Sequence, residues 1–328
     1  MEILKNVKWG IIGCGEVTEK SGGALSLVYK SEVVAVMNED EETARTYAEK
    51  HGIEKWYTDP LSIIGDEDIN AVYIASPPST HATYAIMAMK AGKPVYIEKP
   101  MAASYEDCMR INRISKETGI PCFVAYYRRT LPYFQKVREL LHSGVIGQVM
   151  NLQIRFAQPA QNLDYTSTTQ PWRVQSDTIA GAFFYDLASH QLDILQDLFG
   201  CILEAEGYTN NLMKLHQASD TISACFKFDS GLPGSGSWCF VAHHSAAVDK
   251  IEVIGNKGQI RFSIFTYDPI ELYTAGGKEE IEILPPENPQ LALITSVVEH
   301  LQGKAICTAD GISATPTNWV MDKILKKI

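Results

Sequence analysis

The alternation of short apolar runs with amphipathic stretches over the first 125 or so residues constrains the fold most. β-rich runs bounded by glycine, proline or polar residues occur at Trp9–Ile12, Val33–Met37, Ala71–Ala75, Val95–Ile97 and Cys122–Ala125. The stretches between them have helical periodicity. Strands that alternate with helices form right-handed βαβ units, which place helices on both faces of a parallel sheet. We therefore predict a doubly wound Rossmann domain of the α/β class over residues 1–125.

Two of the intervening helices have recognisable ends. Thr80 is expected to cap one helix, and Gly92 to close it. Ser104 begins the other, with Asp107 at the spacing of a capping box and Gly119 at the end.

The pattern changes after residue 125. Helices are expected from about Pro132 to Ser143 and from Phe183 to Leu198, among runs of strand character joined by short turns. Those runs are Val149–Ala157, Thr221–Phe228, Ser235–Val241, Lys250–Ile254, Gln259–Phe262, Pro269–Tyr273 and Glu279–Leu284. Consecutive strands with short connections favour an antiparallel sheet. Residues 126–328 are therefore expected to form an α+β domain with a large, mostly antiparallel open sheet.

Composition excludes several function classes. The chain has 328 residues, a net charge of −10 and 45% hydrophobic residues, so it lacks the basic surface that nucleic acid requires. Its seven cysteines are scattered without a CxxC pair, which argues against zinc and for a reducing compartment. No secretory signal or membrane-spanning run is recognised. We expect a cytoplasmic protein that acts on a small molecule and uses no metal.

The turn after the first predicted strand reads Gly13-Cys14-Gly15-Glu16-Val17. The first glycine permits a tight turn, the second permits close approach of a pyrophosphate, and the following helix offers free N–H groups. Thr18 stands where the full fingerprint has glycine or alanine, so the motif alone fits a plain strand-to-helix turn equally well. Its position in the first βα turn favours dinucleotide binding.

Asn38 follows the second predicted strand, where an acidic residue usually binds the adenosine ribose. Its amide can bond a ribose hydroxyl, while Glu39 and Asp40 would repel a 2′-phosphate. This favours NAD as the cofactor. Asn38 as a plain turn residue is the alternative, and it leaves NADP possible.

Three further motifs carry more specific information: Ser76-Pro77-Pro78-Ser79-Thr80-His81, Glu98-Lys99-Pro100, and Trp172-Arg173 followed by Asp186-Leu187-Ala188-Ser189-His190. Together with the glycine turn, they resemble the glucose–fructose oxidoreductase and inositol dehydrogenase family (Gfo/Idh/MocA). The resemblance is dense from about Trp9 to Gly200 and looser beyond.

The resemblance implies roles for individual residues. Lys99, Asp186 and His190 would form the catalytic set. Cofactor contacts are implied at Ser76, Pro77, His81, Glu98, Lys99, Tyr127, Trp172 and Arg173. A C-terminal sheet that forms homodimer or homotetramer contacts is also implied. Compared with the family, Tyr127 stands where an amide is common, and Gln290 stands where the resemblance implies a tyrosine that contacts the cofactor.

The residues themselves are chemically suited to this work. Asp186 and His190 lie four apart and share a helix face, where a carboxylate raises the proton affinity of an imidazole. Lys99 follows a buried strand at the edge where open α/β sheets bind ligands, although taken alone it reads as a surface lysine paired with Glu98. We expect interconversion of a secondary alcohol and a ketone on a sugar, cyclitol or related polyol. An NAD-dependent glycosidase of the same fold and a catalytically silent sugar sensor are the alternatives.

Overall fold

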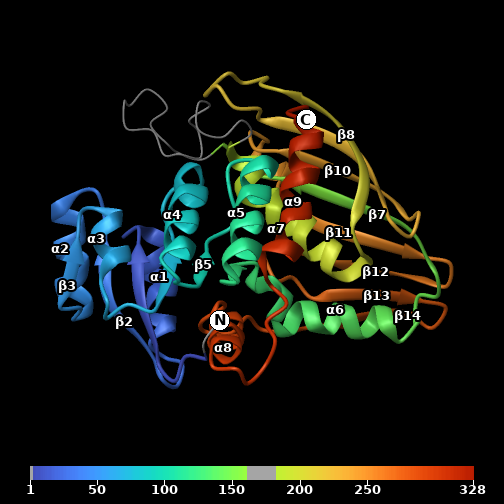
Figure 1. Ribbon diagram of the computed structural model, residues 1–328. Helices are drawn as coiled ribbons and strands as arrows, with labels where there is room; N and C mark the ends of the chain where they lie inside the picture. Colours follow the sequence, from blue (N-terminus) through green and yellow to red (C-terminus); the bar gives the residue numbers. More distant parts are fainter. Residues whose placement is uncertain (1–2, 161–181) are drawn as a thin grey trace. The chain divides into compact units, whose positions relative to one another are not determined.

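The computed structural model describes residues 3–160 and 182–328 of the chain, which fold into two compact units (Figure 1). Unit 1 comprises the chain up to Tyr127 together with Glu287–Asn318, and unit 2 comprises Arg128–Pro286 and Trp319–Ile328. This division differs from the expected boundaries, 1–125 and 126–328, because the chain returns to unit 1 near its end. Among the described residues, no helix is long and apolar enough to cross a membrane.

Unit 1 is built on a parallel sheet whose described strands run in the order β3-β2-β1-β4-β5-β6. The strands are β1 (Val7–Ile12), β2 (Ser31–Met37), β3 (Lys55–Tyr57), β4 (Ala71–Ile74), β5 (Val95–Ile97) and β6 (Cys122–Val124). β4, β5 and β6 are buried along their whole length, as expected of short apolar strands covered on both faces. The predicted Rossmann sheet is thus confirmed. β3 was missed because three half-exposed edge residues show no periodicity.

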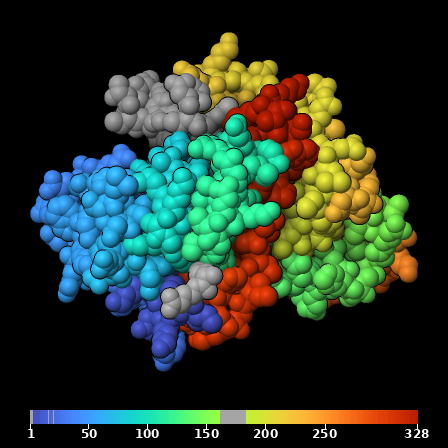
Figure 2. All heavy atoms as spheres, in the orientation of Figure 1, coloured from blue at the N-terminus to red at the C-terminus, as the bar shows by residue number. Residues whose placement is uncertain are grey.

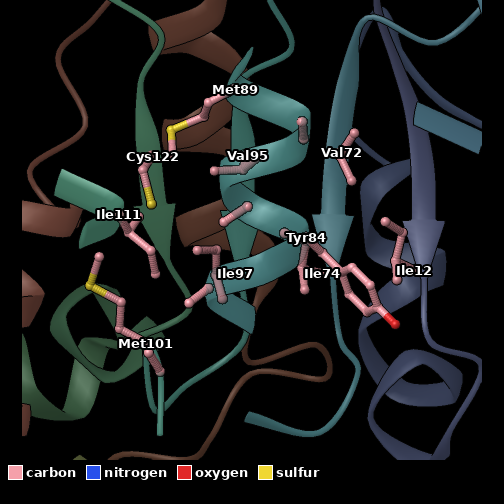
Figure 3. Packing of buried hydrophobic residues seen from close by; sticks show 14 of the residues in the cluster. Ile12, Val72, Ile74, Tyr84, Met89, Val95, Ile97, Met101, Ile111 and Cys122 are labelled. Atoms are coloured by element: carbon pink, nitrogen blue, oxygen red, sulfur yellow. The ribbon is translucent and has the colours of Figure 1, made fainter. Parts of the chain in front are cut away.

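Helices cover both faces of this sheet. The helices are α1 (Glu16–Leu25), α2 (Glu41–His51), α3 (Pro60–Gly65), α4 (Pro78–Lys90), α5 (Tyr105–Thr118) and α8 (Leu291–Leu301). The last helix, α9 (Gly311–Ile324), belongs to unit 1 up to Asn318 and to unit 2 from Trp319. Residues of α3, α4 and α5 pack with Ile12, Val72 and Ile97 in one core (Figure 3). Residues of α1, α2 and α8 share the other core with Trp9 and Tyr73. The outward sides of α4 and α5 contribute to the surface seen in Figure 2.

The helix ends follow local chemistry. Ser104 caps α5 by accepting the N–H of Asp107 at 3.1 Å, and Gly119 ends the helix in the left-handed region, as predicted. The predicted cap at Thr80 is wrong. α4 begins at Pro78, since a proline in the first helical position needs no hydrogen-bond partner and already has a helical φ angle.

α8 is the element that returns the chain to unit 1. Its buried residues Leu293, Ile294, Val297, Val298 and Leu301 have the three-and-four spacing of an amphipathic helix. This spacing in the sequence indicates a helix. We did not predict α8, because we expected mainly strands in the second half of the chain.

Unit 2 contains an eight-stranded sheet in the described residues, in the order β14-β13-β12-β11-β7-β10-β9-β8. Its strands are β7 (Val149–Ala157), β8 (Ile202–Asn210), β9 (Thr221–Phe228), β10 (Pro233–Cys239), β11 (Val248–Gly255), β12 (Gly258–Phe262), β13 (Ile270–Thr274) and β14 (Gly277–Ile281). Only β7 and β10 pair in parallel among these strands, which confirms the mostly antiparallel prediction. The polar edge strand β8 was missed.

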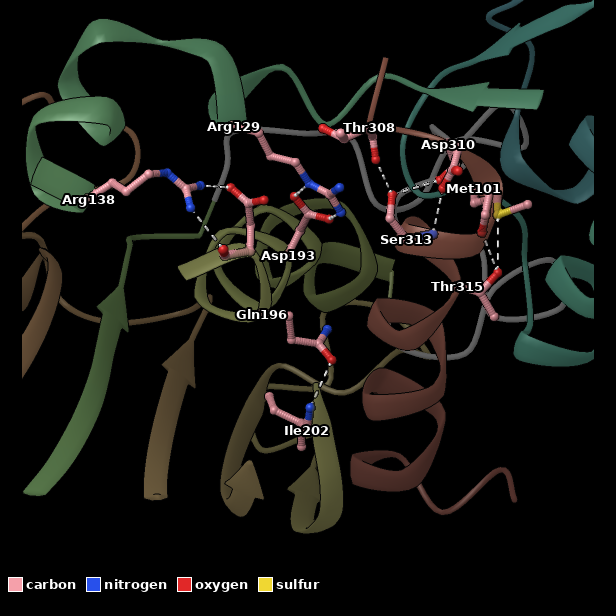
Figure 4. A network of polar contacts seen from close by, with 12 residues as sticks. Met101, Arg129, Arg138, Asp193, Gln196, Ile202, Thr308, Asp310, Ser313 and Thr315 are labelled. Carbon is pink, nitrogen blue, oxygen red and sulfur yellow. Dashed lines mark hydrogen bonds and ion pairs between the residues drawn. The ribbon is translucent and has the colours of Figure 1, made fainter. Parts of the chain in front are cut away.

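The helices of unit 2 are joined by ion pairs. α6 (Pro132–His142) and α7 (Ala182–Phe199) lie where helices were predicted, and the 3₁₀ turn η1 (Tyr127–Thr130) precedes α6. Arg129 donates from Nε and Nη2 to the two carboxylate oxygens of Asp193 on α7, at 2.9 and 2.5 Å (Figure 4). Both side chains are buried, with 8% and 1% of their surfaces exposed. Asp193 therefore serves to fasten η1 to α7.

Replacing Asp193 with asparagine removes the carboxylate that pairs with a buried guanidinium, which costs about 3–5 kcal/mol of unfolding free energy. Asp197 on the same helix pairs with the partly exposed Arg138, so Asp197→Asn is the matched control, with an expected loss of about 1 kcal/mol. Urea unfolding of both variants measures the difference. Equal losses would show that burial of the Arg129–Asp193 pair is unimportant.

Candidate functional site

The turn between β1 and α1 requires glycine at its first position. Gly13 has a φ of +104°, and a Cβ there would lie 2.7 Å from the backbone of Ala75 and Ser76. Its N–H donates to the carbonyl of Met37 at 2.8 Å. Gly13 thus lets the chain turn closely beside the ends of β2 and β4.

The second glycine leaves space at the start of a helix. Gly15 caps α1, and a Cβ there would meet nothing within 4 Å. Thr18, which departs from the usual fingerprint, accepts the N–H of Gly15 at 2.9 Å and is fully buried. The open space and the N-terminus of α1 fit a pyrophosphate, because a helix N-terminus attracts anions and a side chain at Gly15 would occupy the room.

The remaining turn residues have distinct positions. The Cys14 thiol points to the carbonyl of Met37 at 3.6 Å, and burial raises its pKa to about 12, so it stays protonated. Glu16 begins α1, and its side chain lies outside the described part of the structure. Val17 is half-buried in the first turn of the same helix.

The end of β2 carries the residues expected to meet the adenosine ribose. The side-chain oxygen Oδ1 of Asn38 accepts the N–H of Asp40 at 2.9 Å, so Asn38 is a turn residue. Its Nδ2 group is the part of the side chain suited to bind a ribose hydroxyl. Glu39 accepts a hydrogen bond from the Tyr84 hydroxyl at 3.0 Å. Asp40 caps α2 through the N–H of Thr43. Two carboxylates are thus fixed directly after this strand.

His81 connects two loops at the carboxyl edge of the sheet. Its Nε2 lies 2.8 Å from the carbonyl oxygen of Ser76, and its Nδ1 lies 3.1 Å from that of Pro100. Burial lowers its pKa to about 4, so the ring is neutral at physiological pH. Pro77 caps α4 between these contacts. The neutral His81 ring thus lies between the loop after β4 and the loop that carries Lys99, and its single N–H can donate to one of the two carbonyls.

Glu98 and Lys99 directly follow β5. The Glu98 carboxylate, 6% exposed, accepts from the Tyr73 hydroxyl at 2.7 Å and from Nε2 of Gln290 at 3.0 Å, both at Oε1. Its Oε2 lies 3.3 Å from the backbone N–H of Lys99. Burial raises the Glu98 pKa, while the Tyr73 and Gln290 hydrogen bonds and the charge of Lys99 oppose that rise.

The other predicted residues belong to unit 2 or lie at its border. Tyr127, half-buried, is the last residue of the first segment of unit 1. Asp186 and His190 are both buried on α7, and the His190 ring meets Phe265 edge-on at a centroid distance of 6.0 Å. Trp172 and Arg173 lie outside the described residues. The structure thus brings Gly13, Gly15 and the loop of Ser76 together in unit 1, and Asp186 with His190 in unit 2.

Sequence reasoning missed the tyrosines of the central strands. Tyr73 and Tyr96 are paired in register on β4 and β5 and stack at 5.2 Å. A tyrosine in an otherwise aliphatic buried strand needs a hydrogen-bond partner for its hydroxyl. This requirement could have predicted a buried polar network beside β4 and β5. Gln290 was noticed only as a departure, and Phe265 was not considered. In the described residues, no group of three or more His, Cys, Asp or Glu side chains could hold a metal ion.

Comparison with family models places both parts of the chain. Residues 7–126 match the model described as "Oxidoreductase family, NAD-binding Rossmann fold", and residues 134–261 match the GFO/IDH/MocA C-terminal domain. "Oxidoreductase P35" of Formosa agariphila is 36% identical over 90% of this chain and 90% of its own length. Myo-inositol 2-dehydrogenase of Thermotoga maritima is 29% identical over 76% of this chain and 73% of its own.

Solved structures share the fold. Levoglucosan dehydrogenase, determined in complex with NADH and levoglucosan, superposes with a TM-score of 0.86 at 21% identity, covering 98% of this chain and 96% of the other. The Rossmann sheet, its glycine turn and the family models define an NAD-binding oxidoreductase. The chain belongs to the Gfo/Idh/MocA family.

Substitutions of the two glycines of the turn are expected to affect different properties, stability for Gly13 and NADH affinity for Gly15. Gly13→Ala forces a Cβ against backbone in the left-handed region, so we expect a loss of about 2–3 kcal/mol of stability. Gly15→Ala places its methyl group in open space at a φ of −120°, so its loss of stability should not exceed the roughly 1 kcal/mol of a poorer N-cap residue. NADH affinity of Gly15→Ala should fall at least about tenfold, or 1.4 kcal/mol. Fluorescence titration with NADH tests this, and unchanged affinity would remove Gly15 from the pyrophosphate site.

Proposed function

We propose that this protein interconverts a secondary alcohol and a ketone on a sugar, cyclitol or related polyol, with NAD as the cofactor. The observation that carries the proposal is Lys99, set directly after β5 at the carboxyl edge of an NAD-binding sheet. Relatives named as inositol dehydrogenases support the substrate class. We propose that the glycine turn binds the cofactor. Its further contacts are proposed to be Asn38, Ser76, Pro77, His81, Glu98, Lys99, Tyr127, Trp172 and Arg173.

We propose three catalytic residues. The bound nicotinamide supplies a hydride acceptor for oxidation and a donor for reduction. The Lys99 ammonium stabilises negative charge that develops on the substrate oxygen. The His190 imidazole accepts the hydroxyl proton, and Asp186 orients His190 or the substrate. Unit 2 supplies the substrate-binding residues in this proposal.

Lys99→Ala is expected to lower kcat by at least about 100-fold, because a positioned charge at a developing oxyanion contributes roughly that much. NADH affinity should fall much less than kcat, since the phosphate-binding turn is untouched. Lys90→Ala, at the exposed end of α4, is the matched control. Near-normal turnover of Lys99→Ala on an identified substrate would show that Lys99 is not catalytic.

A screen of sugars, cyclitols and polyols with NAD and NADP, read by absorbance of the reduced cofactor, tests the function. We expect NADH to accumulate and NAD to be preferred, because the carboxylates of Glu39 and Asp40, which follow β2, would repel a 2′-phosphate. Bond cleavage in a glycoside without net NADH would favour the glycosidase. Cofactor binding with no turnover would favour the silent sensor, and absence of cofactor binding would contradict the proposal as a whole.

We also propose that the protein forms a homodimer or homotetramer through the sheet of unit 2. On β9, the exposed residues Ser223, Cys225 and Lys227 alternate with buried or half-buried ones, so this face of the strand is exposed among the described residues. Ser237 on the neighbouring β10 faces the same side. Light scattering should give a multiple of 36.4 kDa, and Ser237→Arg should lower it. A monomer mass for the unaltered protein would exclude this interface.

The scattered cysteines without CxxC spacing support a cytoplasmic location. Cell fractionation tests it, and recovery of the protein outside the cytoplasm would contradict it.

A further inference from the structure

The Glu98 carboxylate is held at both oxygens by groups from separate parts of unit 1. Tyr73 of β4 and Gln290, at the N-cap of α8, both donate to Oε1, at 2.7 and 3.0 Å. Oε2 accepts the backbone N–H of Lys99 at 3.3 Å. The direction of the carboxylate plane is therefore tied to the peptide that places Lys99.

The donor orientation of Gln290 is fixed rather than adaptable. The Tyr96 hydroxyl donates to Oε1 of Gln290 at 3.2 Å, so Nε2 must face Glu98. The backbone N–H of Gln290 donates to Oδ1 of Asn288 at 3.1 Å, and only 8% of the residue is exposed. Burial raises the pKa of Tyr96 well above 10, so its hydroxyl remains a donor at all relevant pH values.

We propose that Gln290 is a positioning residue for Lys99 and acts through the Glu98 carboxylate. A buried carboxylate that loses one of its donors can rotate toward the remaining ones, and the Lys99 peptide would follow it. The proposal rests on the proposed function only in treating Lys99 as catalytic. The contact between Gln290 and Glu98 stands independently of any substrate.

Gln290→Glu gives the sharpest test, because the new carboxyl can donate only while it holds a proton. Two carboxyl groups about 3 Å apart share one proton and release it at raised pH. Below that pH, the protonated side chain replaces the amide donor. Above it, the donor is lost and two negative charges face each other. We expect kcat relative to the unaltered protein to fall up to about tenfold per pH unit above the pKa of the pair.

Two further variants separate positioning from general damage. Gln290→Leu removes the donor without a titrating group, so its loss of kcat should not recover at low pH. Gln302→Glu adds a charge at the other end of α8, away from Glu98, and should show the pH profile of the unaltered protein.

Lysine labelling tests the proposal without a substrate. Acetylation of the Lys99 amine, followed by mass spectrometry from about pH 6 to 10, is compared with that of Lys90 in the same sample. The added negative charge in Gln290→Glu should stabilise the Lys99 ammonium and slow its labelling about threefold near pH 9. Gln290→Leu should change the labelling rate of Lys99 at all pH values, and Gln302→Glu should leave it unchanged.

The outcomes are distinguishable. Altered Lys99 labelling in both Gln290 variants supports the proposal even if no polyol is oxidised, in which case only the proposed function fails. Unchanged Lys99 labelling in both folded variants overturns it, as does loss of kcat in Gln290→Glu that is the same at every pH. If Gln290→Glu does not fold at high pH, the labelling of Lys99 in Gln290→Leu still decides the question.

Discussion

The buried carboxylate of Glu98 joins the parts of unit 1 that carry the proposed site. An ionised carboxylate taken out of water needs donors at its oxygens, and these come from a central strand and from the start of α8. Ser21 of α1 lies 2.7 Å from the Tyr73 hydroxyl, so the same network reaches the helix that follows the glycine turn. The dinucleotide turn and the Lys99 loop are thereby linked through buried polar contacts.

The Rossmann half could be predicted from sequence because its strands are short apolar runs with clear ends. The glycine turn, the cap at Ser104 and the position of Lys99 after β5 all depend on local rules. The contacts of Glu98 could not be predicted in this way, since Gln290 lies 192 residues further along the chain. Nothing local to Leu291–Leu301 says that this helix packs with α1 and α2 in the N-terminal unit.

Two residues have roles in the structure that their sequence patterns do not indicate. Thr18 looked like a defect in the glycine motif, yet its hydroxyl satisfies the N–H of Gly15 at the helix start. Asp193 lies three residues beyond His190 on the same helix, yet it neutralises the buried Arg129. In both cases, the role of the residue follows from the partner that the fold brings into contact with it.

The return of the chain to unit 1 also bears on how the protein is made. On the ribosome, the first 127 residues emerge long before α8, which supplies five buried residues to one face of the parallel sheet. Until residue 301 has left the exit tunnel, α1 and α2 cover that apolar face without α8, and Glu98 lacks one of its donors. The nucleotide-binding unit is therefore completed after translation of nearly the whole chain, and its folding is coupled to synthesis of the unit inserted within it.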